Sequence, residues 1–191
     1  MAKNAKLGDG CIVRSVKNAS LDFMTTDLTL LLLKKDMCEQ ENFVTSKIGT
    51  QKSGYGGTKP IYKFSTHVDE KITEVANASY SDLIADLDKE DLFLWFLDDG
   101  SWHKTKNTMH LYSNMLNDEE TSNLISRIGE IYGIEPRPRK DRKKDGRSFN
   151  YLYFSRALVK KFRPEFKDYV ISHGIESMYY KFGGLDYKEA V

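Results

Sequence analysis

The chain has 191 residues, and its 29 lysines and arginines nearly balance 28 aspartates and glutamates, for a formal net charge of +1. This length suits one domain or two small halves, with enough core to fold without disulfides. A charge so near zero excludes attraction of polyanions by overall charge alone. The two cysteines, Cys11 and Cys38, form no spaced set with the four histidines, which argues against a zinc site.

The compartment follows from the cysteines and from the apolar segments. Two cysteines without a signal-peptide pattern indicate a reducing environment. The apolar run Leu28–Leu33 is far too short to span a bilayer. We therefore expect a soluble intracellular protein of the cytoplasm or an organelle matrix, neither secreted nor bound to a membrane.

The N-terminal segment ends in Leu7-Gly8-Asp9-Gly10, which places a carboxylate directly before a glycine. Residues 11–26 predict a β-hairpin, because residues 20–26 alternate as strands do and the polar pair Lys17-Asn18 separates two apolar stretches.

The next two elements are a helix over residues 27–39, with Asp27 as its N-cap, and a second hairpin over residues 43–68. The turn of this hairpin is expected in residues 52–57, which contain three glycines. The side chains expected to face the core are Leu28, Leu31, Leu32, Ile61, Phe64 and Val68.

Residues 69–88 are acidic and predict helix, with a break near residues 77–81. The segment Asp91–Trp102, DLFLWFLDDGSW, follows. Its apolar run is hydrophobic on every face and therefore buried, and the absence of β-branched residues favours a helix that Gly100 ends. The pair Asp98-Asp99 then lies at a helix C-terminus, where the macrodipole disfavours negative charge. Such a pair indicates either a core helix whose end reaches solvent or a site that holds a cation.

The second half of the chain repeats the element order of the first. Residues 101–114 predict a hairpin, Asn117 caps a helix that ends at Gly133, and residues 134–156 predict a long basic hairpin. The turn of the basic hairpin is expected near Lys144-Asp145-Gly146, and helical segments over 157–170 and 175–182 close the chain. The order helix end, hairpin, helix, hairpin, helix thus occurs twice, which predicts two halves related by a pseudo-twofold axis.

A pseudo-twofold axis brings the two helix ends side by side, with Asp9 close to Asp99. Two carboxylates from symmetric positions suit a pair of hard divalent cations, which take oxygen ligands and keep several waters. Such a site hydrolyses a phosphodiester in line, and its symmetry matches the two strands of a duplex.

Basic residues gather in both corresponding hairpins, while the helical segments hold most of the acids. This distribution favours a sheet laid against phosphates, with ribbons that fit the major groove. For any single lysine run a solvated loop is the alternative. The residues expected to bind DNA are Arg14, Lys17, Lys47, Lys52, Lys59, Lys63, His103, Lys104, Lys106, Arg137, Arg139, Lys140, Arg142, Lys143, Lys144 and Arg147.

These segments resemble the LAGLIDADG homing endonucleases. LFLWFLDDGSW resembles the second motif of the members that carry two repeats in one chain, Leu7–Ile12 resembles the end of the first motif, and Ser177–Phe182 resembles the closing segment with its active-site lysine. The resemblance covers nearly the whole chain. It implies an α+β fold of two pseudo-twofold αββαββα repeats, residues 1–88 and 89–191, with antiparallel saddle-shaped sheets on DNA.

The resemblance also implies a monomeric, site-specific endonuclease of the mobile intron or phage type, which cuts double-stranded DNA with Mg²⁺. By position, Asp9 and Asp99 match the metal-binding acids, and Lys181 matches the lysine that stabilises charge on the phosphate. Asn114 matches a polar residue that organises active-site water. Asp98 is the neighbour of the ligand, not the ligand.

The first motif departs from the family pattern. Lys3, Asn4 and Lys6 lie where a buried helix should pack, so this repeat is degenerate with a shortened helix, and neither Lys71 nor Lys89 is a good match for its lysine. The alternative function is therefore a non-catalytic DNA-binding regulator or an intron RNA maturase on the same scaffold. An interaction module without nucleic acid is a third, more distant reading.

Overall fold

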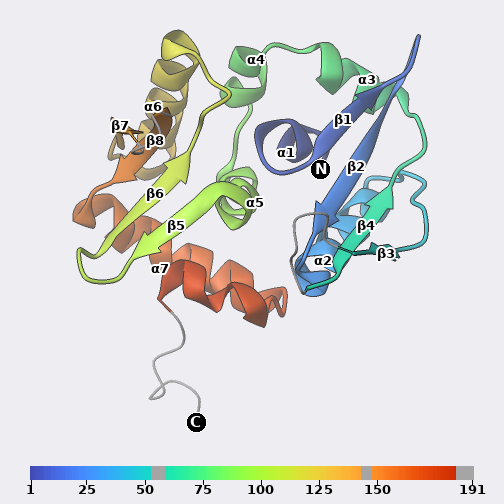
Figure 1. The fold of residues 1–191 in the computed structure, drawn as a ribbon. Helices are drawn as coiled ribbons and strands as arrows, with labels where there is room; N and C mark the ends of the chain where they lie inside the picture. Colours follow the sequence, from blue (N-terminus) through green and yellow to red (C-terminus); the bar gives the residue numbers. More distant parts are fainter. Residues whose placement is uncertain (53–58, 143–147, 184–191) are drawn as a thin grey trace. The chain divides into compact units, whose positions relative to one another are not determined.

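The computed structural model describes residues 1–52, 59–142 and 148–183. The chain divides into two compact units, Met1–Ala78 and Ser79–Val191. Each unit contains one four-stranded antiparallel sheet with helices packed against it (Figure 1). The mixed fold with two antiparallel sheets, expected from the sequence, is confirmed.

In the first unit the sheet has the strand order β1-β2-β4-β3. Phe23 and Phe64 face each other on the two central strands, and their rings stack with centroids 5.1 Å apart. This pair forms the centre of the unit's core because both side chains are at most 2% exposed. The elements of this unit are α1 (Ala2–Leu7), β1 (Cys11–Arg14), β2 (Ala19–Thr25), α2 (Leu28–Gln40), β3 (Gly49–Gln51), β4 (Ile61–Ser65) and α3 (Glu70–Asn77).

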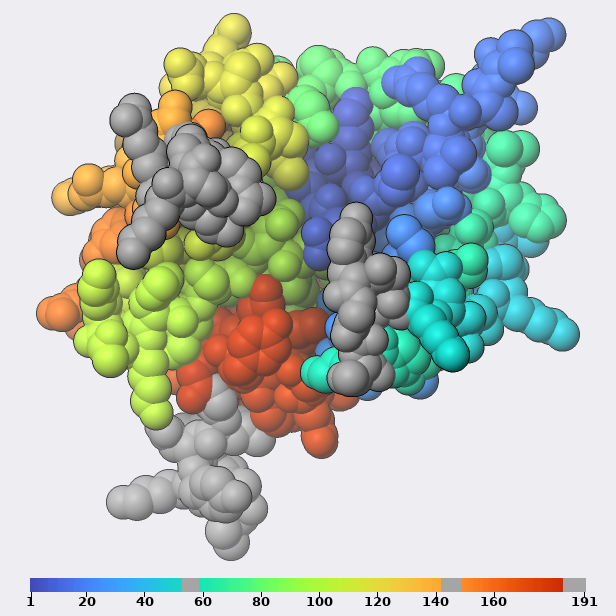
Figure 2. Space-filling view, viewed as in Figure 1, coloured from blue at the N-terminus to red at the C-terminus, as the bar shows by residue number. Residues whose placement is uncertain are grey.

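The hairpin predicted over residues 11–26 is confirmed as β1 and β2. Its tip protrudes from the first unit (Figures 1 and 2), and Val16 at this tip is fully exposed. Helix α2 also begins as predicted, because the side chain of Asp27 accepts a hydrogen bond from the backbone N–H of Leu30 at 3.0 Å.

The buried side of α2 differs from the prediction. Leu31 is buried as expected, but Leu28 is 39% and Leu32 is 43% exposed. The buried stripe includes Leu30 and Cys38, which lie two turns apart on the same face. The first turns of α2 are leucine-rich all round, so the sequence pattern does not single out the face that meets the sheet.

Two of the three inward positions predicted for the second hairpin are also corrected. Phe64 is buried, but Ile61 lies three residues earlier on β4, on the opposite face of the sheet, and is only half-buried. Val68 is 53% exposed because it lies beyond the end of β4, immediately before the N-cap of α3. The predicted turn of this hairpin falls largely in residues 53–57, outside the described residues.

The predicted break in the acidic helical stretch is confirmed. Helix α3 ends at Asn77, and α4 (Tyr80–Ala85) starts anew after the N-cap Ser79. The Ser79 and Asp82 side chains each accept a hydrogen bond from the other residue's backbone N–H, which fixes the start of α4.

The central apolar segment forms helix α5 (Lys89–Asp99), as predicted, and every residue from Asp91 to Leu97 is buried. Gly100 ends the helix in extended backbone, with φ −85°. Gly100 lies so close to the last turns of α5 that a Cβ there would overlap Phe96, so this position needs a residue without a side chain. Gly10 has the same role at the end of α1, where a Cβ would overlap Ala5.

In the second unit the sheet has the order β5-β6-β8-β7, and its core is aromatic. The ring of Phe162 lies 5.2 Å from the rings of Phe96 and Phe154, and Phe166 lies 5.0 Å from Phe96. The remaining elements are β5 (Gly100–His103), β6 (Thr108–Tyr112), α6 (Asp118–Tyr132), β7 (Arg137–Arg142), β8 (Ser148–Phe154), α7 (Arg156–Ser172) and the 3₁₀ helix η1 (Glu176–Phe182).

The ends of α6 agree with the sequence prediction. Asn117 caps its start by accepting from the Glu120 N–H at 2.9 Å, and Gly133 ends it with a left-handed φ of 68°. Pro164 lies inside α7 without ending it. The turn predicted at residues 144–146 lies outside the described residues.

Candidate functional site

The C-terminal end of α5 carries two acids. Asp98 and Asp99 are the last residues of this buried helix, both are half-buried, and the last turn contains no basic residue. The free carbonyl groups of a helix end already carry partial negative charge, so two added carboxylates make this end strongly favourable for a cation.

Lys181 supplies a cation to this helix end. Its side chain comes from η1, is 7% exposed, and donates hydrogen bonds to the carbonyl oxygens of Gly100 at 2.6 Å and of Asp98 at 3.3 Å. The predicted active-site lysine is therefore held at the end of the helix that carries the predicted metal ligand Asp99. Its catalytic role stays a prediction.

Asn114 takes part in the sheet of the second unit. Its side-chain Oδ1 accepts a hydrogen bond from the backbone N–H of Asn150 at 2.7 Å, just beyond the last paired residue of β6. The side chain thus continues the ladder between β6 and β8. The predicted role of Asn114 in ordering water stays a prediction.

Asp9 is exposed and follows the end of α1 in the first unit. The nearby Lys6 bonds to the C-terminal end of α3. Its Nζ donates to the carbonyl oxygens of Val75, Ala76 and Ala78 at 3.2, 3.2 and 2.5 Å. Asp9 and Asp99 belong to different units, and the expected meeting of their carboxylates stays a prediction.

A divalent metal would need oxygen ligands from the acidic side chains. Within residues 1–52, 59–142 and 148–183, no three or more His, Cys, Asp or Glu side chains form a metal cluster. Mg²⁺ needs no such cluster, because it usually binds through one or two carboxylates, water and substrate phosphates. Asp99, at the end of α5, carries a half-buried carboxylate, and its role as a metal ligand stays a prediction.

Most of the predicted DNA-binding cations extend into solvent. Arg14 is exposed, yet its guanidinium donates to the Asn77 side chain at 2.8 Å and to the Ala76 carbonyl, which ties it to the end of α3. His103 is half-buried. The other predicted residues found exposed are Lys17, Lys47, Lys52, Lys59, Lys63, Lys104, Lys106, Arg137, Arg139 and Lys140.

Three of the remaining predicted cations, Lys143, Lys144 and Arg147, lie outside the described residues, and Arg142 ends β7. The DNA-binding roles of all these residues stay predictions.

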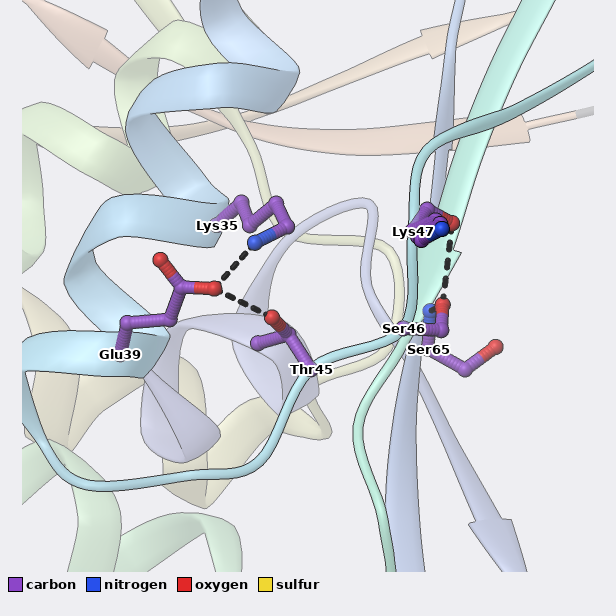
Figure 3. A network of polar contacts seen from close by, with 6 residues as sticks. All are labelled: Lys35, Glu39, Thr45, Ser46, Lys47 and Ser65. Atoms are coloured by element: carbon purple, nitrogen blue, oxygen red, sulfur yellow. Dashed lines mark hydrogen bonds and ion pairs between the residues drawn. The ribbon is translucent and has the colours of Figure 1, made fainter.

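Lys47 follows Thr45 and Ser46 in the segment after α2, and these two residues bond to α2 and to β4 (Figure 3). Glu39 of α2 accepts hydrogen bonds from Lys35 and Thr45, and these bonds lower the pKa of its carboxyl group. On the other side, the Ser46 hydroxyl accepts from the Ser65 N–H at 3.0 Å. The backbone that presents Lys47 is therefore fixed on both sides.

A group of rings on the second sheet was not predicted from the sequence. His110 lies between His103 and Tyr151, with ring centroids at 4.1 and 4.4 Å, and Tyr112 lies 5.8 Å from Tyr151. Burial, then the nearby His103 and Lys106, lower the pKa of His110 to about 4. The alternation of rings in HLY and YLY, with period two, is the sequence signal that indicates this surface.

The chain thus combines two four-stranded antiparallel sheets with a helix end that carries two acids and a buried lysine. The model of the LAGLIDADG DNA endonuclease family matches residues 7–162. The chain therefore belongs to the LAGLIDADG DNA endonuclease family, as the resemblance of its motifs indicated.

Solved structures share the fold at low sequence identity. The homing endonuclease I-WcaI bound to its DNA recognition sequence is 18% identical, with a TM-score of 0.67 over 97% of this chain and 84% of that one. I-DmoI in complex with DNA and Ca is 14% identical, with a TM-score of 0.55 over 86% and 87% of the two chains.

The N-terminal LAGLIDADG domain of DUF199/WhiA is 11% identical, with a TM-score of 0.51 over 84% of this chain and 80% of that one. No curated protein sequence matches the chain. Among the helices of the described residues, none has the length and hydropathy needed to cross a membrane.

Proposed function

We propose that this protein is a site-specific endonuclease of the homing type, which hydrolyses phosphodiester bonds in both strands of a DNA duplex with Mg²⁺. The observation that carries the proposal is the C-terminal end of α5, where Asp99 is the last residue and the buried ammonium of Lys181 bonds to the carbonyl oxygen of the next residue, Gly100. Family membership supports the same chemistry.

In the proposed mechanism, the carboxylates of Asp99 and Asp9 would hold the metal. When bound, Mg²⁺ supplies an activated water and neutralises charge on the leaving oxygen. The fixed ammonium of Lys181 stabilises the negative charge that develops on the phosphate, and it needs no reorganisation because two carbonyl oxygens already orient it. Asn114 orients the attacking water.

The exposed lysines and arginines of the sheet hairpins support double-stranded DNA as the partner. The proposal includes a monomer with two repeats, residues 1–88 and 89–191. It also includes an intracellular location and an origin in a mobile intron or a phage.

The test is cleavage of a plasmid library that carries the DNA flanking the protein's own gene, with and without Mg²⁺. The wild-type protein should produce discrete double-strand breaks only with the metal. Asp99→Asn should abolish cutting and leave DNA affinity within about twofold, because the carboxylate acts on the metal and not on folding.

Asp98→Asn is the matched control for this test. It changes the adjacent half-buried acid, which is the neighbour and not the ligand, and it should retain cutting. Equal loss of cutting in the two variants, or loss of DNA binding in Asp99→Asn, would contradict the assigned role.

A second candidate function is a non-catalytic DNA-binding regulator or an intron RNA maturase. It is favoured by Asn4, a polar residue of the first motif that is only 4% exposed in α1. Specific binding without any break at any Mg²⁺ concentration would support this candidate over the nuclease. Stimulated splicing of the host intron RNA would identify the maturase.

A further inference from the structure

The open face of the second sheet, opposite its helices, is lined by aromatic rings. The intervening residues of the same strands point to the core: Met109, Leu111, Leu152 and Phe154 are at most 1% exposed. Alternation along the strands places the rings on the other face, where each is half-buried. We call this set the ring ladder, and its members are His103, His110, Tyr112, Tyr151 and Tyr153.

The rings of the ladder lie against one another. His110 is inclined by 38° to His103 and by 28° to Tyr151, at centroid distances that correspond to direct contact. Tyr151 is followed by Tyr112 at 5.8 Å. Because the faces of His110 and Tyr151 cover one another, the polar groups of this pair lie at the ring edges: the ring nitrogens of the histidine and the hydroxyl group of the tyrosine.

The centre of the ladder is uncharged at neutral pH. Burial, followed by the nearby His103 and Lys106, lowers the pKa of His110 to about 4, and the acidic Asp141 opposes this shift. A neutral imidazole offers one donor and one acceptor. It therefore contributes hydrogen bonds, not the charge that makes phosphate binding sensitive to salt.

The corresponding face of the first sheet has a different character. Register pairs Asp22 with Ser65 and Met24 with Lys63 on that face. In the part of the first sheet that the structure describes, the open face carries no aromatic ring. The ladder is thus a feature of the second unit alone and does not follow from the fold.

We propose that His110 and Tyr151 are specificity-determining residues that read base edges in the half-site bound by the second unit, while the exposed lysines supply the affinity. The proposal rests on the duplex-binding function given above. Sequence is read by hydrogen bonds to base edges in the major groove, whereas phosphate contacts position the protein and carry no sequence information.

The stacked geometry favours contacts with base edges of a duplex over a platform that binds single-stranded nucleic acid. Sheets that bind single strands stack unpaired bases on exposed aromatic faces. In the ladder the faces of His110 and Tyr151 already contact each other, so the outward groups are hydrogen-bonding edges.

The experiment starts from a randomised duplex library selected with the wild-type protein. Dissociation constants for a selected duplex and a scrambled one are then compared for the wild type, Tyr151→Phe, Tyr151→Ala and His110→Ala. Tyr151→Phe keeps the ring and removes only the hydroxyl. It should reduce the ratio of the two affinities by about tenfold, within the range for loss of a base contact, and leave the salt dependence unchanged.

Lys104→Gln is the matched control, because Lys104 is an exposed cation at the turn next to the ladder. It should weaken binding to both duplexes equally and reduce the slope of log affinity against log salt by about one. Circular dichroism of each variant reports whether the fold is kept, and Tyr151→Phe separates readout from packing if the alanine variants unfold.

Three results would overturn the proposal. An unchanged affinity ratio in Tyr151→Phe would show that the tyrosine edge is not read. Tighter binding of single-stranded RNA than of duplex, lost in Tyr151→Ala but kept in Tyr151→Phe, would identify a stacking platform instead. A wild-type protein that binds no duplex at low salt would refute the proposed function itself, together with this inference.

Discussion

At the scale of single residues, Lys181 explains how α5 ends in two acids. A helix C-terminus disfavours carboxylates, and α5 has no basic residue in its last turn. The compensating charge comes from η1, whose Lys181 is buried and bonds to two carbonyl oxygens at this end. Stability and the proposed chemistry therefore depend on the same ammonium group.

Lys181→Met should lower the free energy of unfolding by about 1.5–3 kcal/mol, because the variant loses hydrogen bonds donated by a charged group. Urea denaturation measures this change. Lys160→Met alters an exposed lysine of α7 and should stay within about 0.5 kcal/mol. Similar losses in both variants would show that Lys181 does not stabilise the helix end.

His110 gives a pH-dependent prediction. Its pKa in the folded protein is about 4, below the ordinary value of 6.5, so the unfolded chain binds more protons between these values. The free energy of unfolding should therefore decrease as pH falls from about 6.5 to about 4, through this residue. His110→Gln should show a smaller decrease than the wild type in urea titrations across this range, and parallel curves would contradict the shift.

The sequence alone singled out the acids of α5 as candidate site residues, but it did not single out Lys181 or Asn114. An apolar run followed by Asp-Asp-Gly has a physical signature, whereas Lys181 is one lysine among many and was assigned only through the family resemblance. Asn114 was assigned in the same way, and the structure shows it bonded to Asn150. Such pairings join residues far apart in sequence, and no local pattern reveals them.

At the scale of elements, a glycine after α1 and another after α5 let the following strand begin close to the helix. Gly10 and Gly100 both stand where a Cβ would overlap the preceding helix, at Ala5 and Phe96. Each glycine directly follows an acid, Asp9 or Asp99, so the close approach fixes the backbone that presents that acid.

Gly100→Ala should lower the free energy of unfolding by about 1–3 kcal/mol, because the added methyl group forces Phe96 or the helix end to shift. Gly49→Ala is the matched control, since its nearest neighbours, Lys63 side-chain atoms, lie 3.8 Å away. Equal stability of the two variants by thermal or urea denaturation would contradict the close approach.

The boundaries of elements were more predictable than their buried faces. Caps at Asp27 and Asn117 and the break near Ser79 follow from local side-chain chemistry, and the structure confirms them. The buried face of α2 depends on the sheet it meets. A leucine-rich helix without a polar side leaves that choice to tertiary packing, which explains the exposure of Leu28 and Leu32.

At the scale of the whole molecule, near-neutral net charge coexists with basic hairpins. A group of cations lies on strands and their turns, and the sequence showed this group because charge is visible without a structure. The ring ladder was not foreseen, since single histidines and tyrosines in strands are common and only their register brings them together.

Affinity for duplex DNA should fall steeply with salt, with a log–log slope of about −0.9 for each phosphate contact. The reason is release of counterions from the phosphates that the exposed lysines and arginines contact. Fluorescence anisotropy at several salt concentrations measures the slope, and Asp99→Asn should reproduce it. A flat response would argue against a phosphate-binding surface.

The open faces of the two sheets differ, and this difference bears on the direction in which the protein would lie along a duplex. If the protein binds a duplex as proposed, the ring ladder on one sheet and Asp22, Met24 and Lys63 on the other would distinguish a target from the same target turned end to end. The protein would then adopt one orientation on DNA, and Lys181 would meet the same strand of the target each time. The direction of the recognition sequence would thereby decide which phosphate lies at this lysine.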